Sequence, residues 1–188
     1  FVAFGIKNAV LPFHTWLPDA HSEAPSPFSA VLSGILVRMG MYGFILAFFV
    51  IFTFEQFLRL GAGGCRFHHI LAWIGALNVV FPTFIAMLQN DSKRLLAWHG
   101  VGQGGYMVLG VALGTELGVT GGIFHIVNHT SYIALLFLVV GAVEYRTGGV
   151  RDLNSLGGLA RKMPIAFVGA LVGAFGLIGL PLTNGFVS

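Results

Sequence analysis

Residues 6–40, IKNAVLPFHTWLPDAHSEAPSPFSAVLSGILVRMG, decide the fold of this chain. Two apolar stretches flank a polar and aromatic interruption that is rich in proline. The first stretch carries Lys7 and the second carries Arg38. A cation at the middle of a membrane helix costs roughly 2.5–3.5 kcal/mol on insertion scales. Because chains seldom accept that cost without a use for the charge, these residues predict an ion pathway beside a broken helix.

The composition is that of a chain embedded in a lipid bilayer. Of the 188 residues, 56% are hydrophobic and 9% are charged, whereas soluble domains carry about 25% charged residues. The mean hydropathy of +0.85 points the same way. The net charge is only +3 and the basic residues are scattered, so no nucleic-acid partner is expected. The single Cys65 allows no internal disulfide and forms no metal site alone. We therefore predict an all-α, polytopic transmembrane helical bundle.

Apolar runs predict where the helices cross the membrane. The expected crossings are residues 28–52, 70–88, 95–113, 119–143 and 163–180, and residues 54–66 and 144–162 are expected as polar connections. The apolar run at residues 1–11 is too short to span a bilayer, which takes roughly 20 residues. Pro12 lacks an N–H group and can end this helix just past Lys7. A second half-helix is then expected at residues 14–21.

Two breaks in the backbone are expected at membrane depth, at residues 12–27 and 181–185. Non-helical backbone persists there only against protein or water, so we expect a hydrated cavity beside each break. Asp19, His21 and Glu23 are expected in the solvated part of the first break. Interrupted helices in two halves of one membrane chain are typical of transporters.

The predicted loops differ in charge between the two sides of the membrane. One side receives Lys93, Arg94, Arg146, Arg151, Arg161 and Lys162, and the other receives Arg59 and Arg66. The positive-inside rule places the richer side in the cytoplasm.

The two cations in the apolar stretches have competing interpretations. Lys7 can be a lysine near a helix end whose alkyl stem reaches the interface. It can also be a buried amine, held between desolvation and a nearby carboxylate, that takes and releases a proton. Arg38 stays protonated in proteins, so it is either a fixed counter-charge or a part of the pathway.

The histidines also leave alternatives open. His125 and His129 lie four residues apart and so share one helical face. They can bind a metal, although no third ligand is evident, pack as satisfied interior residues, or relay protons, since histidine titrates near neutrality. His99, Gln103 and Tyr106 form a polar stripe on another predicted helix. This stripe can belong to the pathway or make hydrogen bonds between helices.

Four stretches resemble, in order and spacing, the antiporter-like membrane subunits of respiratory complex I, membrane-bound hydrogenases, formate hydrogenlyases and multisubunit sodium/proton antiporters. They are KNAVLPFHTWLPDAHSEAPSPFSAVLSGILVRMGMYGF from residue 7, QNDSKRLLAWHGVGQGGYMVLG from residue 89, GGIFHIVNHTSYIALLFLVVGAVEYRTG from residue 121 and LGGLARKMPIAFVGALVGAFGLIGLPLTNGFVS from residue 156. Together they cover nearly the whole chain.

The resemblance implies a fold of two inverted repeats of five helices, each with an interrupted helix. Residues 1–188 are then an internal fragment of one transmembrane domain. Residues 1–52 end the first repeat, with the helix break at 12–27. Residues 67–188 make up most of the second repeat, with the helix break at 181–185.

The resemblance also implies roles for single residues. Lys7 matches a lysine that transfers protons at mid-membrane, and its glutamate partner is expected before Phe1. Arg38 stands where several members carry a lysine, and His125 and His129 match the histidines of the family. A family lysine is missing at Ile133, so a proton wire would need water or a neighbour such as His129 to bridge the gap. A further family lysine is expected after the last residue.

We therefore expect a subunit that translocates protons, or exchanges Na+ for protons, in a redox-driven complex of the NADH:quinone oxidoreductase or hydrogenase type. The expected site residues are Lys7, Arg38, His99, His125 and His129, acting with water. The expected partners are other membrane subunits of a multisubunit complex and the lipid bilayer of a prokaryotic cell membrane. No cofactor, metal or redox centre of its own is expected. Two alternatives are a non-conducting structural subunit, suggested by Ile133, and a quinone-reacting subunit.

Overall fold

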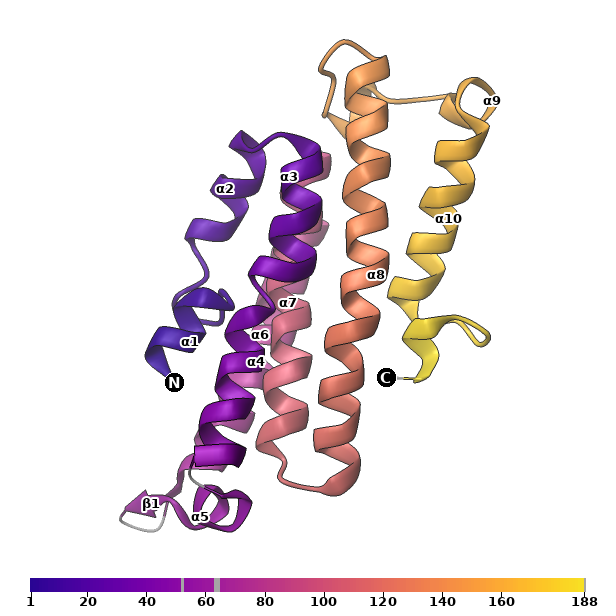
Figure 1. The fold of residues 1–188 in the computed structure, drawn as a ribbon. Coiled ribbons are helices and arrows are strands. Elements are labelled where there is room, and N and C mark those ends of the chain that lie inside the picture. The colour runs from indigo at the N-terminus through magenta and orange to yellow at the C-terminus, as the bar shows by residue number, and fades with distance from the viewer. Residues whose placement is uncertain (52, 63–64, 188) are drawn as a thin grey trace.

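The computed structural model describes residues 1–51, 53–62 and 65–187. Its long helices run side by side in one bundle (Figure 1). They are α6 (Phe67–Met87), α7 (Ser92–Ala112), α8 (Glu116–Arg146) and α10 (Pro164–Ile178). The segments Ser26–Ile51, Phe67–Met87 and Glu116–Arg146 are long and apolar enough to cross a membrane. The predicted all-α bundle is confirmed, with one short hairpin of β1 (Gly61–Ala62) and β2 (Cys65–Arg66) added to it.

The first long crossing is a chain of four helical pieces, α3 (Ser26–Val31), η1 (Leu32–Leu36), α4 (Met39–Ile45) and η2 (Leu46–Ile51). Pro25 and Pro27 stand at its entry, where proline is tolerated. The pieces η1 and η2 are π-helical, a wider winding that is often found at functional sites. The π-helical turn η1 ends two residues before Arg38, which begins α4 as its N-cap.

An interrupted helix precedes this crossing. Its halves are α1 (Val2–Lys7) and α2 (Trp16–Glu23), so the helix ends at Lys7 and resumes two residues later than the sequence predicts. The connection is anchored on two other helices through Asn78. The amide of Leu11 donates to Asn78 Oδ1 (2.9 Å), and Asn78 Nδ2 donates to the carbonyl of Val101 (2.7 Å). Non-helical backbone is thus held against protein.

The other helix ends follow local signals. Asp91 caps α7 by accepting from the amides of Lys93 and Arg94, as an N-cap carboxylate does. Helix α10 ends where Gly179 takes a φ of 72°, a conformation that favours glycine. The chain then turns through Pro181 into η4 (Asn184–Val187). The second interruption therefore starts after Ile178, slightly earlier than the expected residues 181–185.

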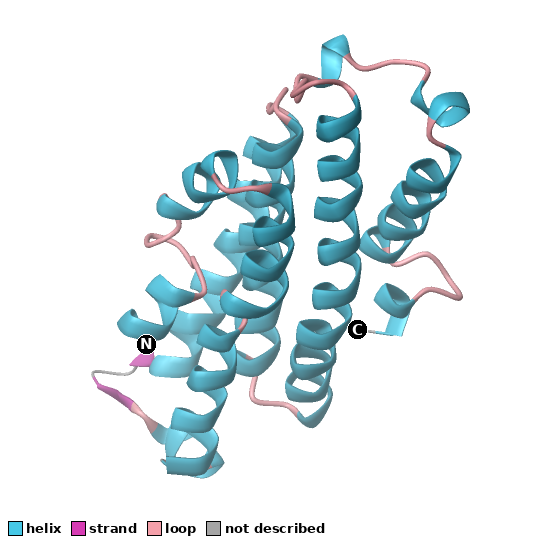
Figure 2. Ribbon diagram, turned by 45° about the horizontal axis from the view of Figure 1, so that its top comes forward, coloured by secondary structure: helices cyan, strands magenta, loops and turns pink. Residues whose placement is uncertain are grey.

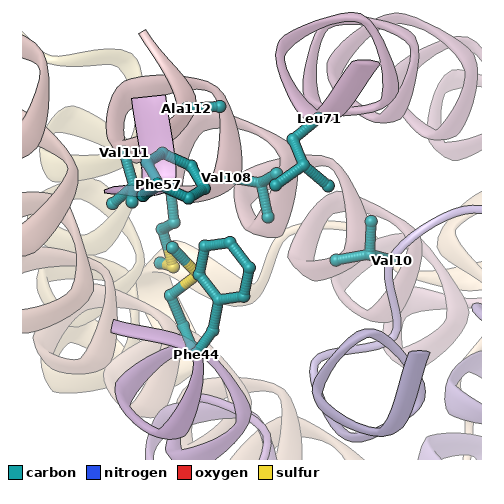
Figure 3. Close-up of a cluster of buried hydrophobic side chains, with 9 residues drawn as sticks. Val10, Phe44, Phe57, Leu71, Val108, Val111 and Ala112 are labelled. Atoms are coloured by element: carbon teal, nitrogen blue, oxygen red, sulfur yellow. The ribbon is translucent and has the colours of Figure 1, made fainter. Parts of the chain in front are cut away.

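The main apolar core lies where α4, α6 and α7 meet. Figure 3 shows Phe44, Phe57, Val108 and Leu71 among the buried side chains of this core. Phe57 belongs to α5 (Phe54–Arg59) and is fully buried. Residues 54–66 are therefore not only a polar connection, because burying one aromatic ring folds α5 back onto the bundle.

The two groups of loops lie at opposite ends of the bundle (Figures 1 and 2). One end holds α5 and the hairpin. The other holds η3 (Leu153–Ser155), α9 (Leu159–Lys162) and the turn before α7, which pairs with the loop after α8. There the amide of Ser92 donates to Arg151 O, and the amide of Leu153 donates to Asn90 O. This is the separation of basic loops that the sequence predicts.

Candidate functional site

Arg38 lies at the centre of the site. It is 3% exposed. Its Nη1 donates to Asn8 Oδ1 (3.3 Å) and its Nη2 donates to the carbonyl of Gly100 (2.9 Å). Nη2 also lies 3.3 Å from His129 Nε2. Because a guanidinium has no acceptor, His129 Nε2 accepts this bond, and the proton of the neutral imidazole sits on Nδ1.

The described residues give Arg38 no carboxylate partner. Their ion pairs are Arg59–Glu55, Lys93–Glu144, Arg94–Asp19 and Arg151–Asp91. A buried cation without a counter-charge is costly unless polar groups surround it. Here an amide, a carbonyl and an imidazole supply that surrounding, which identifies the position as a polar centre inside an apolar bundle.

Glycines make room for this centre. A Cβ at Gly104 would lie 3.3 Å from both Arg38 Nη1 and Asn8 Nδ2, and one at Gly40 would lie 2.8 Å from the backbone nitrogen of Asn8. Both distances are shorter than ordinary contacts of a Cβ atom. Helices α1, α4 and α7 can therefore approach Arg38 closely only because these positions lack a side chain.

A second polar group lies on α7 and α8, next to the first. His125 Nε2 lies 2.7 Å from Gln103 Oε1, and the hydroxyl of Tyr132 donates to the same oxygen (3.0 Å). The rings of His125 and His129 are 6.1 Å apart. The polar stripe on α7 thus does make hydrogen bonds between helices. His99 lies one turn before Gln103 and is half-buried.

The structure brings four of the five predicted site residues together. The charge of Arg38 acts on His99, His125 and His129. A metal does not suit the two histidines on α8, because Nε2 of each is already engaged by Gln103 or Arg38. Among the described residues, no three His, Cys, Asp or Glu side chains form a cluster that could hold a metal ion.

A cavity of about 400 Å³ opens beside this second polar group. Gln103, His125 and Tyr132 line it on one side, and Gly176 and Gly185 line it on the other. Its position beside the end of α10 agrees with the cavity expected at the second break.

Lys7, the fifth predicted residue, is the last residue of α1. Its side chain is exposed in the described chain, and no ion pair of the described residues includes it. The following residue, Asn8, is buried and bonded to Arg38. Lys7 is therefore one residue from the polar centre but points away from its buried side, and its interpretation as a buried amine stays a prediction.

Ile133, where a family lysine is missing, lies in an apolar cluster. It is fully buried among Ala30, Leu96, Tyr132 and Phe137. A charge at this position would have apolar neighbours. The row of polar side chains on α8 that starts at His125 therefore ends at His129 and Tyr132.

Lys93 and Glu144 form a site that the sequence pattern did not predict. The Lys93 side chain is only 3% exposed, and its Nζ lies 2.8 Å from Glu144 Oε2. Ser26 Oγ donates to the same carboxylate oxygen (2.7 Å), and Lys93 Nζ also donates to Ala24 O (3.2 Å). The placement of both residues in polar loops is wrong, because α7 begins at Ser92 and α8 continues to Arg146. Asp91 as an N-cap was the available signal.

His21 was also misplaced by the sequence pattern. It is fully buried rather than solvated, and its ring stacks on Phe137 with centroids 4.6 Å apart. Neither ring nitrogen has a hydrogen-bond partner among the described residues. Leu17 and His21, four residues apart on α2, both face inward. That spacing was the signal that could have located the histidine.

These features define a polytopic helical membrane protein with an interrupted helix and a buried polar centre. The chain matches the family described as NADH:quinone oxidoreductase/Mrp antiporter, transmembrane, over residues 1–188, and it belongs to this family. The resemblance seen in the four motifs is thereby confirmed. The chain is that of a multi-pass integral membrane protein of a prokaryotic membrane.

Two curated relatives illustrate the similarity. NAD(P)H-quinone oxidoreductase chain 4 1 of Synechococcus sp. (strain JA-3-3Ab) is 40% identical over 191 residues, covering 99% of this chain and 34% of the relative. NADH-quinone oxidoreductase subunit M of Rickettsia prowazekii (strain Madrid E) is 34% identical over 187 residues, covering 100% of this chain and 36% of the relative. The chain thus spans about a third of the length of these relatives.

Solved structures show the same fold. The Mrp complex from Dietzia sp. DQ12-45-1b contains a chain with a TM-score of 0.90 and 33% identity, covering 99% of this chain and 33% of that chain. For the archaeal membrane-bound sulfane sulfur reductase the TM-score is 0.89 at 37% identity, and the match covers 98% of this chain and 31% of that chain. For respiratory complex I from Thermus thermophilus the TM-score is 0.82 at 31% identity, and the match covers 99% of this chain and 38% of that chain.

Proposed function

We propose that the protein containing this chain translocates protons across the membrane as an antiporter-like subunit of a multisubunit complex. The observation that carries the proposal is the buried contact between Arg38 and His129, next to the hydrogen-bonded group of His125, Gln103 and Tyr132. Intramembrane ionisable residues commonly mark ion or proton pathways. The relatives in quinone oxidoreductases and Mrp complexes support the same function.

In this proposal Arg38 is a fixed positive charge. Arginine holds its proton, and its bond to His129 Nε2 favours the neutral imidazole. A proton can rest on His129 only when negative charge approaches or when a neighbouring cation is lost. We assign that second event to Lys7, whose amine can release its proton when a carboxylate partner moves away.

Proton movement beyond this pair uses water and the second polar group. His125 and Tyr132 share one acceptor, Gln103 Oε1, so a proton that reaches His125 has hydrogen-bonded neighbours on two helices. The cavity beside them provides space for water. His99, one turn before Gln103 on α7, also belongs to the proposed site. The proposed division into repeats, residues 1–52 and 67–188, places the Arg38 helix in one repeat and these histidines in the other.

The proposed partners are further membrane subunits of a redox-driven or antiporter complex, as in the structures that share this fold. Protons are favoured over Na+ as the transported ion, because a sodium site needs several oxygen ligands and, among the described residues, Arg38 at the polar centre has no carboxylate partner. A purely structural subunit is not favoured, since it would have no use for a buried cation with histidine neighbours.

The test is the substitution Lys7→Ala in the full-length protein within its native complex. Inverted membrane vesicles report proton uptake through quenching of an acridine dye while substrate oxidation drives the complex. We expect proton uptake per turnover to fall by about tenfold or more, as for the loss of a proton-transfer group, while the complex still assembles. Lys162→Ala, in the exposed helix α9, is the matched control. Undiminished proton uptake by the Lys7→Ala complex would reject the proposal.

A further inference from the structure

We propose that His21 and the Lys93–Glu144 pair form a proton-input branch that leads from the loop end of the bundle to Arg38 and His129. The branch rests on the proposed function and adds an entry site to it. Its ligands are water and the proton that water delivers. The argument uses residues of α2, α3, α7 and α8, and α2 and α3 lie at the same end of the bundle as α9 (Figure 1).

The mouth of the branch is a pocket of about 740 Å³ at the junction of α2 and α3. Lys93, Glu144, Ser26 and Arg151 are among its lining residues. The Glu144 side chain is 25% exposed and the Lys93 side chain is 3% exposed. The carboxylate is therefore the group that meets water in the pocket, and the ammonium lies behind it.

Proton entry at the Lys93–Glu144 pair needs no reactant other than the proton that water delivers. A proton from water binds the Glu144 carboxylate and removes the negative charge that stabilises the buried Lys93 ammonium. Lys93 then releases its own proton inward and becomes a neutral amine. When the proton of Glu144 passes to that amine, the ion pair is restored. One proton has entered and the pair is unchanged.

His21 is the acceptor on the inner side. Its backbone carbonyl lies 3.5 Å from Ser29 Oγ, and the charges of both Lys93 at the mouth and Arg38 at the polar centre act on its ring. Its two ring nitrogens are buried and have no partner among the described residues. Buried polar atoms of this kind are normally satisfied by ordered water, and one ring can accept a proton on one nitrogen and release it from the other.

A row of serines marks the route from the mouth to the centre. Ser26, Ser29 and Ser33 lie at positions i, i+3 and i+7 of the α3–η1 segment and are all buried. Ser26 contacts Glu144, and Ser29 Oγ lies 3.5 Å from the carbonyl of His21. Ser33 Oγ has no partner among the described residues.

The inner end of the row reaches Arg38. A Cβ at Gly100 would lie 3.4 Å from Ser33 Oγ and 3.8 Å from Arg38 Nη2, so both groups border the same glycine. Nδ1 of His129 and Nε of Arg38 are also buried without a partner among the described residues. Unpartnered buried polar atoms thus occur at His21, at Ser33 and at the proposed site, and these are the points that bridging waters would link in the proposed branch.

The decisive variant is His21→Phe in the native complex, because phenylalanine keeps the aromatic stacking on Phe137 and removes both nitrogens. We expect proton uptake per turnover in inverted vesicles to fall by about tenfold. His69→Phe, an exposed histidine on α6, is the matched control and should leave uptake unchanged. Glu144→Gln should lower uptake to a similar degree. Combining it with His21→Phe should add little, since both act in one branch.

Ser33→Ala covers the case in which the larger changes prevent assembly. It removes only an unpartnered hydroxyl, and we expect uptake to slow by about threefold. The branch is wrong if Lys7→Ala abolishes uptake while His21→Phe, Glu144→Gln and Ser33→Ala all leave it normal. In that case the proposed function stands. If Lys7→Ala also leaves uptake normal, the proposed function fails as well.

Discussion

At the scale of single residues, Asn78 holds the interrupted helix in place. Its amide joins Leu11 in the break to Val101 on α7, and its side chain is fully buried on α6. One polar side chain thus satisfies the Leu11 amide, which the break leaves without a helical partner, and ties it to the Val101 carbonyl in the middle of α7. The position of the break relative to Arg38 depends on this residue.

Replacing Asn78 with leucine tests this role. The near-isosteric side chain keeps the volume but leaves the amide of Leu11 unpaired and removes the bond to the Val101 carbonyl, which stays within helix α7. We expect a destabilisation of about 1–3 kcal/mol for the buried, unpaired Leu11 amide, seen as a lower melting temperature of the purified full-length protein in detergent. Asn90→Ala, in the exposed turn before α7, should melt like the wild type. An unchanged melting temperature for Asn78→Leu would show that the break is held by other contacts.

The sequence predicted the residues of the polar centre better than the residues around it. Arg38, His125 and His129 interrupt apolar runs and are visible for that reason. His21, Lys93 and Glu144 stand among prolines and charges, where a solvated loop is the ordinary interpretation. His21 and Lys93 are buried, and Glu144 is partly buried, because α2 packs against α7 and because Lys93 finds a carboxylate 51 positions away, at Glu144. Contacts between helices of this kind leave no local pattern.

At the scale of helices, close packing of α6 and α7 depends on two facing glycines. A Cβ at Gly105 would lie 2.7 Å from both Gly75 O and Val79 N, and one at Gly75 would lie 2.8 Å from Leu109 N. Small residues let membrane helices approach until their backbones are in contact. Helix α7, which carries His99 and Gln103, is positioned by this contact.

Gly105→Ala should therefore separate the two helices. Because the methyl group meets backbone rather than a flexible side chain, we expect a loss of about 1–3 kcal/mol, as for overpacking a core, and a lower melting temperature in detergent. Gly121→Ala on α8, where a Cβ would meet nothing within 4 Å, is the matched control. Equal melting temperatures for the two variants would contradict the proposed contact.

Helix positions were predicted from apolar runs, but helix ends were less predictable. Apolar periodicity continues through α6 and α7, and their observed limits lie within a few residues of those predicted. The end of α8 at Arg146 was missed because Glu144 breaks the apolar run while its charge is paired inside the structure. Helix α5 was missed because a single buried phenylalanine does not produce a pattern.

At the scale of the whole molecule, the charged ends predict its orientation. Lys93 no longer counts as a loop charge, because it is buried and paired with Glu144. The end with α9 still carries Arg94, Arg146, Arg151, Arg161 and Lys162, against Arg59 and Arg66 at the other end. The positive-inside rule therefore still places the α9 end in the cytoplasm. The same end holds the mouth of the proposed input branch, so protons would enter from the cytoplasm.

Single cysteines at the two ends test the orientation. Gly157→Cys lies in an open part of the loop between η3 and α9, and Gln56→Cys lies on α5 at the opposite end. In full-length protein with Cys65 replaced by serine, a membrane-impermeant maleimide added to intact cells should label Gln56→Cys and not Gly157→Cys. Inverted vesicles should show the reverse. Labelling of Gly157→Cys in intact cells would place the α9 end outside. Glu144 would then face the side to which protons are delivered, and the branch through His21 would serve as their exit.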